Sequence, residues 1–324
     1  MSVTTGTPTE PGLFSAEAAL TQGVGARVKR VLGSIPTWGM WLVVFIWTLP
    51  TIALLISSFR PSEDLSSGWW KVFTDPNFTL SNYDEVLFTE AGGRQAMWSH
   101  LINSLAIVLP ATIIPVAIAA FAAYAFAWMD FRGRNWIFIT LIAMLALPNQ
   151  MTFVPLLQLF NGGASWTIPF THQPLRLFPE MGIGGTPAAV WLTHTAFGLP
   201  LAIYLLHNYI SQLPRDIFEA ARIDGADHVT IFWRLILPLS VPALAAFGIF
   251  QFLWTWNDFL VASVFVDQDQ SPMTVALVNI TGAQGQRAHL RFPAAFVTIL
   301  VPMIVFFSLQ KHFVRGLLAG SVKG

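Results

Sequence analysis

The sequence lacks cysteine and has few charged residues. None of its 324 residues is Cys, and Asp, Glu, Lys and Arg together make up only 10%. The absence of cysteine excludes disulfides and thiolate chemistry. The charged fraction is well below the roughly 25% that is usual for soluble domains. The formal net charge is zero, so the chain lacks the basic footprint that a nucleic-acid partner requires.

Motifs for catalysis, metal binding and nucleotide binding are also missing. No Gly-x-x-x-x-Gly-Lys-Ser/Thr loop is present to hold a nucleotide, and no His-Glu-x-x-His or Gly-x-Ser-x-Gly element occurs. The histidines are scattered, without the spacing of metal ligands. The sequence therefore predicts a protein that is not an enzyme and that holds no metal or cofactor. If ATP drives its work, ATP and Mg²⁺ must be bound by a different polypeptide.

What the sequence does contain is apolar residues, which make up 54% of the chain. They are gathered in runs of the length that a helix needs to cross a bilayer, roughly 17–25 residues or slightly more. Six such runs are found, at about 38–59, 103–128, 136–160, 189–209, 239–266 and 292–309. We expect an all-α, polytopic membrane protein with a transmembrane domain over 36–324. Residues 1–35 lack an apolar core and are predicted to form a mobile tail rather than a signal peptide.

The distribution of Lys and Arg predicts the orientation. Basic residues before the first run, between the second and third, between the fourth and fifth and after the sixth all fall on one side. The loops of the other side are longer and also acidic. Because short cytoplasmic loops carry the excess of Lys and Arg, both termini and the segment 211–238 are predicted to be cytoplasmic.

This cytoplasmic segment has the signals of two short helices broken at a glycine. Pro214 suits a first helical turn, Gly225 suits the left-handed conformation that ends a helix, and Asp227 can cap the next turn. Pro238 leads into the following apolar run. A helical pair of this kind on a membrane face is well shaped to dock another protein, although geometry alone also allows a plain re-entry loop.

The residues themselves carry a family resemblance. Glu219-Ala220-Ala221, three residues, Gly225, nine residues, then Leu235-Ile236-Leu237-Pro238 resemble the EAA loop of ABC-importer permeases, with Leu235 in place of the usual Ile. In that family the loop docks into a groove on a separate ATPase subunit and couples its closure to the pore. The resemblance implies coupling roles for Glu219, Ala220, Ala221, Asp224, Gly225, Leu237 and Pro238.

The resemblance extends over nearly the whole chain from about residue 38. Leu147-Pro148-Asn149-Gln150-Met151, Trp256-Asn257-Asp258-Phe259-Leu260 and the tail from Phe313 are similar to carbohydrate-type permeases, in particular the smaller subunit of maltose and α-glucoside importers. It implies a type I ABC-importer fold in a bacterial inner membrane. It also implies a homologous second permease, two ATPase copies and an extracytoplasmic sugar-binding protein as partners, besides membrane lipids.

Two further segments take roles from this resemblance. In the family the tail enters the ATPase interface, which implies contacts by Arg315, Gly316 and Gly320. The outer loop at 267–290 is either a contact for the binding protein or a flexible connector. Its candidate contact residues are Gly282, Gln284, Gly285 and Gln286.

Polar groups inside the apolar runs are candidates for the translocation path, because their exposure to lipid is costly. Asn149 and Gln150 follow Pro148, and prolines break membrane helices that often line a cavity. Trp256, Asn257 and Asp258 form the second group, in which the amide and carboxylate serve either helix packing and gating or direct sugar contacts. Asn103, Ser104 and His194 are weaker candidates.

The sequence thus favours a permease subunit of an ATP-driven sugar importer, with an α-glucoside such as maltose, trehalose or sucrose as substrate. A secondary transporter is the alternative, but it should show internal repeats and charged coupling-ion sites, and Asp258 is the one clear carboxylate inside a run. A membrane-embedded enzyme would need a nucleophile or metal cluster, which the sequence does not offer.

Overall fold

The computed structural model describes residues 36–89, 95–167, 169, 173–280 and 287–319, without the side chains of 288 and 311–319. The chain forms two compact units, 1–54 and 55–324, which are described separately. The predicted tail 1–35 lies outside the described residues. The first unit holds most of helix α2 (Thr37–Ser58), whose apolar side chains are exposed, Trp47 to 81%. Such a surface fits contact with lipid or with another protein chain.

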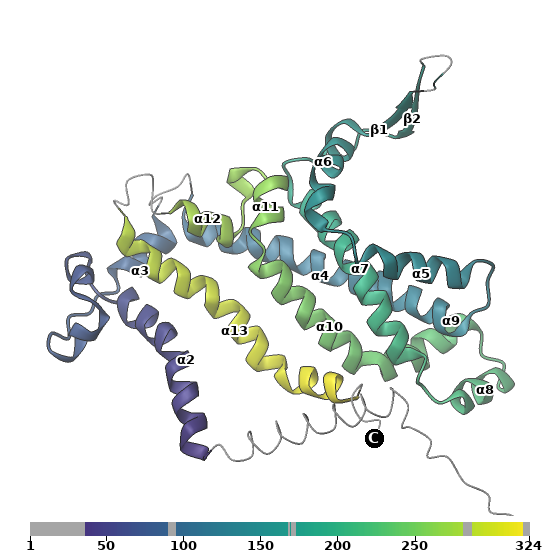
Figure 1. The fold of residues 1–324 in the computed structure, drawn as a ribbon, viewed down its shortest axis with the longest axis horizontal. Helices are drawn as coiled ribbons and strands as arrows, with labels where there is room; N and C mark the ends of the chain where they lie inside the picture. Colours follow the sequence, from purple (N-terminus) through teal and green to yellow (C-terminus); the bar gives the residue numbers. More distant parts are fainter. Residues whose placement is uncertain (1–35, 90–94, 168, 170–172, 281–286, 320–324) are drawn as a thin grey trace, which may run out of the picture. The chain divides into compact units, whose positions relative to one another are not determined.

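The second unit is built on long helices packed side by side (Figure 1). These are α4 (Met97–Trp128), α7 (Pro187–Ile210), α10 (Leu237–Asn257) and α13 (Ala288–Ala319). Helix α10 contacts the other three, and α4 contacts α7 along much of its length. Many of their outward side chains are large and apolar, for example Ile113 at 63% exposure and Ile304 at 55%. This arrangement is expected of helices that meet lipid on one side and each other on the other.

The predicted spans are confirmed in number, with one change of form. Five described helices are long and apolar enough to cross a membrane, and a bent pair brings the total to six if it counts as one span. That pair is α5 (Arg134–Met144) followed by the 3₁₀ turn η3 (Asn149–Thr152) and α6 (Phe153–Gly162), bent by 101°. The apolar run predicted at 136–160 thus consists of two helices joined at a bend. Pro148, which has no N–H to donate, stands at the bend.

The fifth predicted span, 239–266, is shifted towards the N-terminus. Helix α9 (His228–Ile231) continues through the π-helical turn η4 (Phe232–Ile236) into α10, so that the apolar helix covers His228–Asn257. The N–H of Leu237 donates to the carbonyl of Phe232, five residues back. Pro238 cannot donate to the carbonyl four residues before it, which suits a widened turn here. Beyond Asp258 the chain restarts as the short helix α11 (Leu260–Phe265).

Short elements join the long helices. After α2 come the 3₁₀ turns η1 (Ser62–Ser67) and η2 (Trp69–Phe73) and helix α3 (Ser81–Phe88). The 3₁₀ turn η5 (Gln268–Gln270) and helix α12 (Met273–Asn279) precede α13. Strands β1 (Ala164–Thr167) and β2 (Pro174–Phe178) form an antiparallel hairpin. The all-α prediction did not foresee this hairpin.

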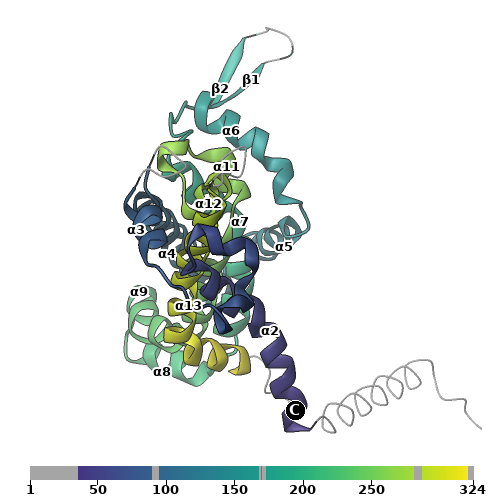
Figure 2. The same ribbon diagram turned by 90° about the vertical axis from the view of Figure 1, so that its left-hand side faces the viewer.

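Apolar cores hold both ends of the second unit. One cluster joins α4, α7 and α10 to the elements between α7 and α10, namely α8 (Arg215–Ile223), α9 and η4. Two further clusters lie around α12 and α13 and around α6, α7 and α11. Figure 2 shows α8 and α9 at one end of this unit and the hairpin at the other. Residues 211–238, which are predicted to couple the chain to an ATPase and are called the coupling segment below, are thus packed on the helices that they connect.

Candidate functional site

The break between the two helices of the coupling segment is a tight turn at Gly225. The N–H of Gly225 donates to the carbonyl of Arg222 at 3.0 Å, and the N–H of Ala226 donates to that of Ala221 at 2.9 Å. This pair of hydrogen bonds is the Schellman arrangement that closes a helix C-terminus. Gly225 has a φ of 80°, in the left-handed region. The prediction of a helix that ends at this glycine is confirmed.

The second helix begins with a side-chain cap, also as predicted. The carboxylate of Asp227 accepts a hydrogen bond from the N–H of Thr230 at 2.8 Å. This hydrogen bond holds the pKa of the Asp227 carboxyl below its usual range. The carboxylate therefore stays ionised at neutral pH, and it satisfies a donor at the start of α9 that would otherwise lack a partner.

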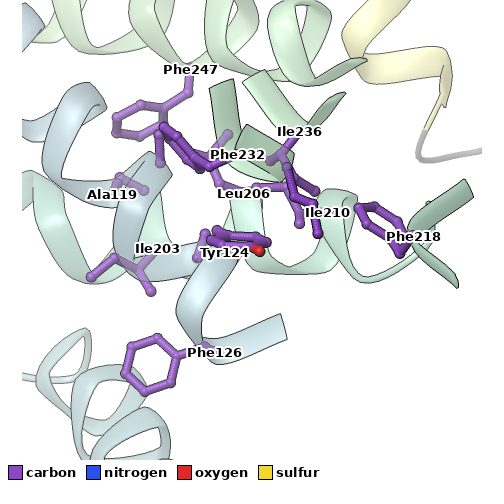
Figure 3. Close-up of a cluster of buried hydrophobic side chains, with 14 residues drawn as sticks. Ala119, Tyr124, Phe126, Ile203, Leu206, Ile210, Phe218, Phe232, Ile236 and Phe247 are labelled. Atoms are coloured by element: carbon purple, nitrogen blue, oxygen red, sulfur yellow. The ribbon is translucent and has the colours of Figure 1, made fainter. Parts of the chain in front are cut away.

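Helix α8 is anchored to the bundle through Phe218. Phe218 is 3% exposed, and its ring centroid lies 3.9 Å from that of Trp128 at the end of α4. The indole N–H of Trp128 donates to the carbonyl of Ile210 at the end of α7, at 3.2 Å. Figure 3 shows Phe218 beside Ile210 and Ile236 in the same cluster. One buried ring therefore links the coupling helix to the ends of α4 and α7.

A second anchor connects α4 to α9 and η4. The hydroxyl of Tyr124 and Nδ1 of His228 form a hydrogen bond of 2.8 Å. The ring of Phe232 stacks on Phe121, with centroids 4.5 Å apart, and also contacts Tyr124. Because α9 and η4 continue into α10, these contacts hold the start of α10 against α4.

The opposite face of the coupling segment is open. Of the predicted coupling residues, Ala221 and Leu237 are half-buried against the cluster, and the others are exposed: Glu219, Ala220, Asp224, Gly225 and Pro238. The apolar side chains of Ile223 and Val229 are exposed to 85% and 63%. An exposed carboxylate beside exposed apolar groups on a rigid helical turn is a surface suited to docking another protein.

A groove of about 390 Å³ opens at the bend between α5 and α6. Its lining joins the broken helix to α7 and α10 and is mostly apolar. Asn149 and Thr152 supply polar groups, and Trp254, Phe250 and Phe197 supply aromatic rings. Irregular backbone at membrane depth is tolerated where it lines a cavity or is buried in protein, and a broken helix beside a cavity is common at transporter binding sites.

The structure separates the predicted path residues. Asn149 lines the groove, whereas Gln150 is exposed and outside its lining. The Trp256 indole lies in the core, where its N–H donates to the carbonyl of Thr298 at 3.0 Å. Asn257 is exposed, and its amide donates to the carbonyl of Leu253 at 2.7 Å. Trp254, which the prediction left out of the path, lines the groove instead; its signal was a Trp two residues before Trp256 in an apolar run.

Asp258 meets His194, at 3.6 Å between Oδ2 and Nε2. His194 is 1% exposed, and Gln251, which sequence reasoning missed, is fully buried. A lone Gln in an apolar run is the signal that could have identified it.

The remaining candidates hold the segment of η5 and α12 or lie outside the described residues. The Asn103 amide donates to the carbonyl of Ser271 at 3.3 Å, and the Ser104 hydroxyl accepts from the N–H of Met273 at 2.8 Å. Arg315 and Gly316 lie on the helical backbone of α13. Gly320 and the loop residues Gly282, Gln284, Gly285 and Gln286 are outside the described part of the chain.

Comparison with known proteins identifies the family. Residues 116–318 match the model of the binding-protein-dependent transport system inner membrane component. The osmoprotective compounds uptake permease GgtD of Synechocystis is 49% identical over 87% of this chain and 89% of its own length. The α-glucoside transport system permease AglG of Rhizobium meliloti is 51% identical over 78% of this chain and 62% of its own length.

The fold agrees with this assignment. A chain of a crystallised bacterial ABC transporter that imports alginate superposes with a TM-score of 0.67, at 18% identity, over 89% of this chain and 98% of that one. The resemblance to carbohydrate ABC-importer permeases in the sequence is confirmed by these matches. The chain is a multi-pass transport subunit of the inner membrane and not an enzyme, with the ATPase on a separate chain. It belongs to the family of binding-protein-dependent transport system inner membrane components.

Proposed function

We propose that this chain forms half of the translocation path of an ATP-driven sugar importer and is coupled to its ATPase through the segment 211–238. The observation that carries the proposal is the double anchorage of this segment. Phe218 packs on Trp128, and Tyr124 bonds to His228, so that α8 and α9 are tied to α4, α7 and α10. A force on α8 is therefore transmitted to the helices around the groove.

The proposed cycle is alternating access with four partner chains. A binding protein delivers the sugar to the outer face, and a homologous second permease supplies the other half of the path. Two ATPase copies close on ATP and move the coupling segments, with both termini and residues 211–238 on the cytoplasmic side. ATP and Mg²⁺ shift the equilibrium only because they bind the closed ATPase pair more tightly than the open one.

The groove at the α5–α6 bend is proposed as this chain's contribution to the path. Asn149 and Thr152 offer hydrogen bonds to hydroxyl groups, and the ring of Trp254 offers an apolar face. Sites that bind small ligands combine a mostly apolar lining with a few polar groups that fix orientation. This chemistry suits the hydroxyls and C–H faces of a sugar.

For the substrate we propose an α-glucoside such as maltose, trehalose or sucrose. The support is the relative named as an α-glucoside permease. The relative named for the uptake of osmoprotective compounds supports a substrate that acts as an osmoprotectant. Trehalose and sucrose fit both names, because each is an α-glucoside and also an osmoprotectant.

The test is the ATPase activity of this chain reconstituted in lipid with its second permease and ATPase subunits. It is measured with the binding protein alone and with the binding protein loaded with maltose, trehalose or sucrose. We expect one loaded form to stimulate hydrolysis and to support uptake of the same sugar. A Gly225→Val variant of this chain serves as the uncoupled control.

The contrary outcome is equally specific. Uptake that follows a proton or sodium gradient without any ATPase subunit would show a secondary transporter and would overturn the proposal. Stimulation by a loaded binding protein with a ligand other than an α-glucoside would retain the importer and overturn the substrate.

A further inference from the structure

His194 is a buried polar side chain in the first half of α7, and its ring has no hydrogen-bonding partner among the described residues. It is 1% exposed, and within the described residues neither Nδ1 nor Nε2 makes a hydrogen bond. Its ring meets one ionisable group of the described residues, Asp258, whose Oδ2 lies 3.6 Å from Nε2. This distance is too long for a hydrogen bond but short enough for a charge–dipole or ion-pair contact.

Asp258 occupies the joint at which α10 ends and α11 begins. Its Oδ2 accepts from the N–H of Ala262 at 3.2 Å, and its backbone carbonyl accepts from the hydroxyl of Thr274 in α12 at 2.9 Å. The carboxylate therefore already holds the first turn of α11, and it has lone pairs left for a further donor. A movement of α7 relative to this joint would change the distance to His194.

The neighbouring contact between these helices is fixed. The Gln251 amide donates to the carbonyl of Ala111 in α4 at 3.2 Å. Gly198 lies so close that an added Cβ would come within 2.8 Å of Gln251 Oε1. On this side α4, α7 and α10 are in close contact, so a relative movement of α7 and α11 would pivot about this point.

His194 is also connected to the groove. Its ring meets Trp254 edge to face, with centroids 5.8 Å apart, and Trp254 lines the groove together with Asn149. A change in the position of His194 therefore reaches the groove wall through one aromatic contact.

We propose that His194 and Asp258 form a latch between α7 and the α10–α11 joint, open in this conformation and closed to hydrogen-bond length in the other transport conformation. The inference rests on the proposed transport function. Buried polar groups without partners are costly, so a conformation that brings Nε2 within hydrogen-bond distance of the carboxylate is favoured by this pair. The two residues are positioning residues that set the balance between conformations.

The absence of cysteine from the chain makes a direct test possible. A single cysteine replaces Asn149 in the groove, and a membrane-impermeant maleimide labels it in the complex assembled in lipid. The rate of labelling reports how often the groove is open, and it requires no sugar. Loss of the latch favours the conformation described here, so His194→Leu and Asp258→Leu should each raise the rate of labelling. Coupling between sites commonly changes equilibria about 5-fold or more, and we expect at least that increase.

The two changes should not add, because either one removes the whole latch. The double variant is expected to label no faster than the single ones. Asp258→Asn retains an oxygen that can accept from the N–H groups of both Ala262 and His194. It should therefore keep the latch and leave labelling unchanged. The matched control is Thr193→Val, which removes a buried hydroxyl that bonds only within its own helix, to the carbonyl of Ala189 at 2.8 Å. It should leave labelling unchanged.

Sugar uptake gives the second readout if the introduced thiol reacts neither in the otherwise unchanged chain nor in the variants. The maximal rate should then fall equally in both single variants and in the double variant, with an unchanged KM. Additive effects, no effect, slower labelling, or an equal effect of Thr193→Val would overturn the latch. The proposed function fails separately, when the unmodified complex shows no ATP-dependent sugar uptake.

Discussion

Tyr124 and His228 lie 104 positions apart in the sequence and share a hydrogen bond of 2.8 Å between the phenolic oxygen and Nδ1. This bond joins the cytoplasmic end of α4, as we orient it, to the first residue of α9. Since α9 continues into α10, the bond connects two helices of the bundle at the point where the coupling segment enters. In the proposed function this contact transmits force between the coupling segment and the bundle, and it does not line the groove.

Tyr124→Phe should weaken this connection while leaving the core filled. The ring contact with Phe232, at 5.6 Å between centroids, is retained. The lost hydrogen bond is worth about 0.5–1.5 kcal/mol. We expect a small fall in the melting temperature of the complex and a clear rise in ATP hydrolysed per sugar imported. Tyr209→Phe is the control, because its hydroxyl donates to the carbonyl of Leu239 near the surface; equal effects of the two variants would contradict a special role for Tyr124.

Phe218→Ala should have a larger effect, because it removes the buried anchor of α8. Truncation of a buried Phe costs about 3–5 kcal/mol when the site cannot collapse. The expected result is a complex that assembles through its membrane helices but hydrolyses ATP without import. The measurement is uptake together with hydrolysis in proteoliposomes. The adjacent Ile217→Ala, at a side chain that is 38% exposed, should leave more of the coupling intact.

The sequence predicted these local elements well because each depends on neighbours along the chain. The helix end at Gly225 and the cap at Asp227 follow from backbone conformation and from one side-chain hydrogen bond within three residues. The apolar runs also predicted the spans, since length and hydropathy decide membrane insertion. The EAA-like spacing predicted the family, and that prediction is confirmed.

Features that depend on distant residues were not predictable. The pairing of His194 with Asp258 joins residues 64 positions apart, and the placement of Trp254 rather than Trp256 in the groove depends on the rotation of α10. The bend of 101° between α5 and α6 was signalled by Pro148, but its angle comes from packing against α7 and α11.

The cap at Asp227 should hold unchanged across the neutral pH range. The pKa of this carboxyl is lower in the folded protein than its unfolded value of 3.8. The stability that the ionised cap contributes is therefore fully present above pH 3.8, and it is lost only as the pH falls below that value through the folded-state pKa. Asp227→Ala should loosen the start of α9 and reduce import, whereas Asp227→Asn, another good cap residue, should retain it. Uptake measured from pH 6 to 8 with both variants checks this; loss of import in Asp227→Asn would show a need for the charge itself.

The exposed surface of the coupling segment gives the last prediction. Gly225 has a φ of 80°, and an added Cβ would meet no atom within 4 Å. A substitution there is therefore penalised by backbone conformation rather than by crowding, and the β-branched Val should suffer most. Asn tolerates the left-handed region better than other residues, so Gly225→Asn is the matched control.

We expect Gly225→Val and Glu219→Lys to uncouple ATP hydrolysis from uptake while the complex still assembles, and Gly225→Asn to retain most of the import. The measurement is the ratio of sugar imported to ATP hydrolysed, with complex assembly followed by co-purification of the ATPase. Normal ratios in both Gly225→Val and Glu219→Lys would remove the coupling role from this surface, and loss of the ATPase from the purified complex would show that the surface serves assembly instead.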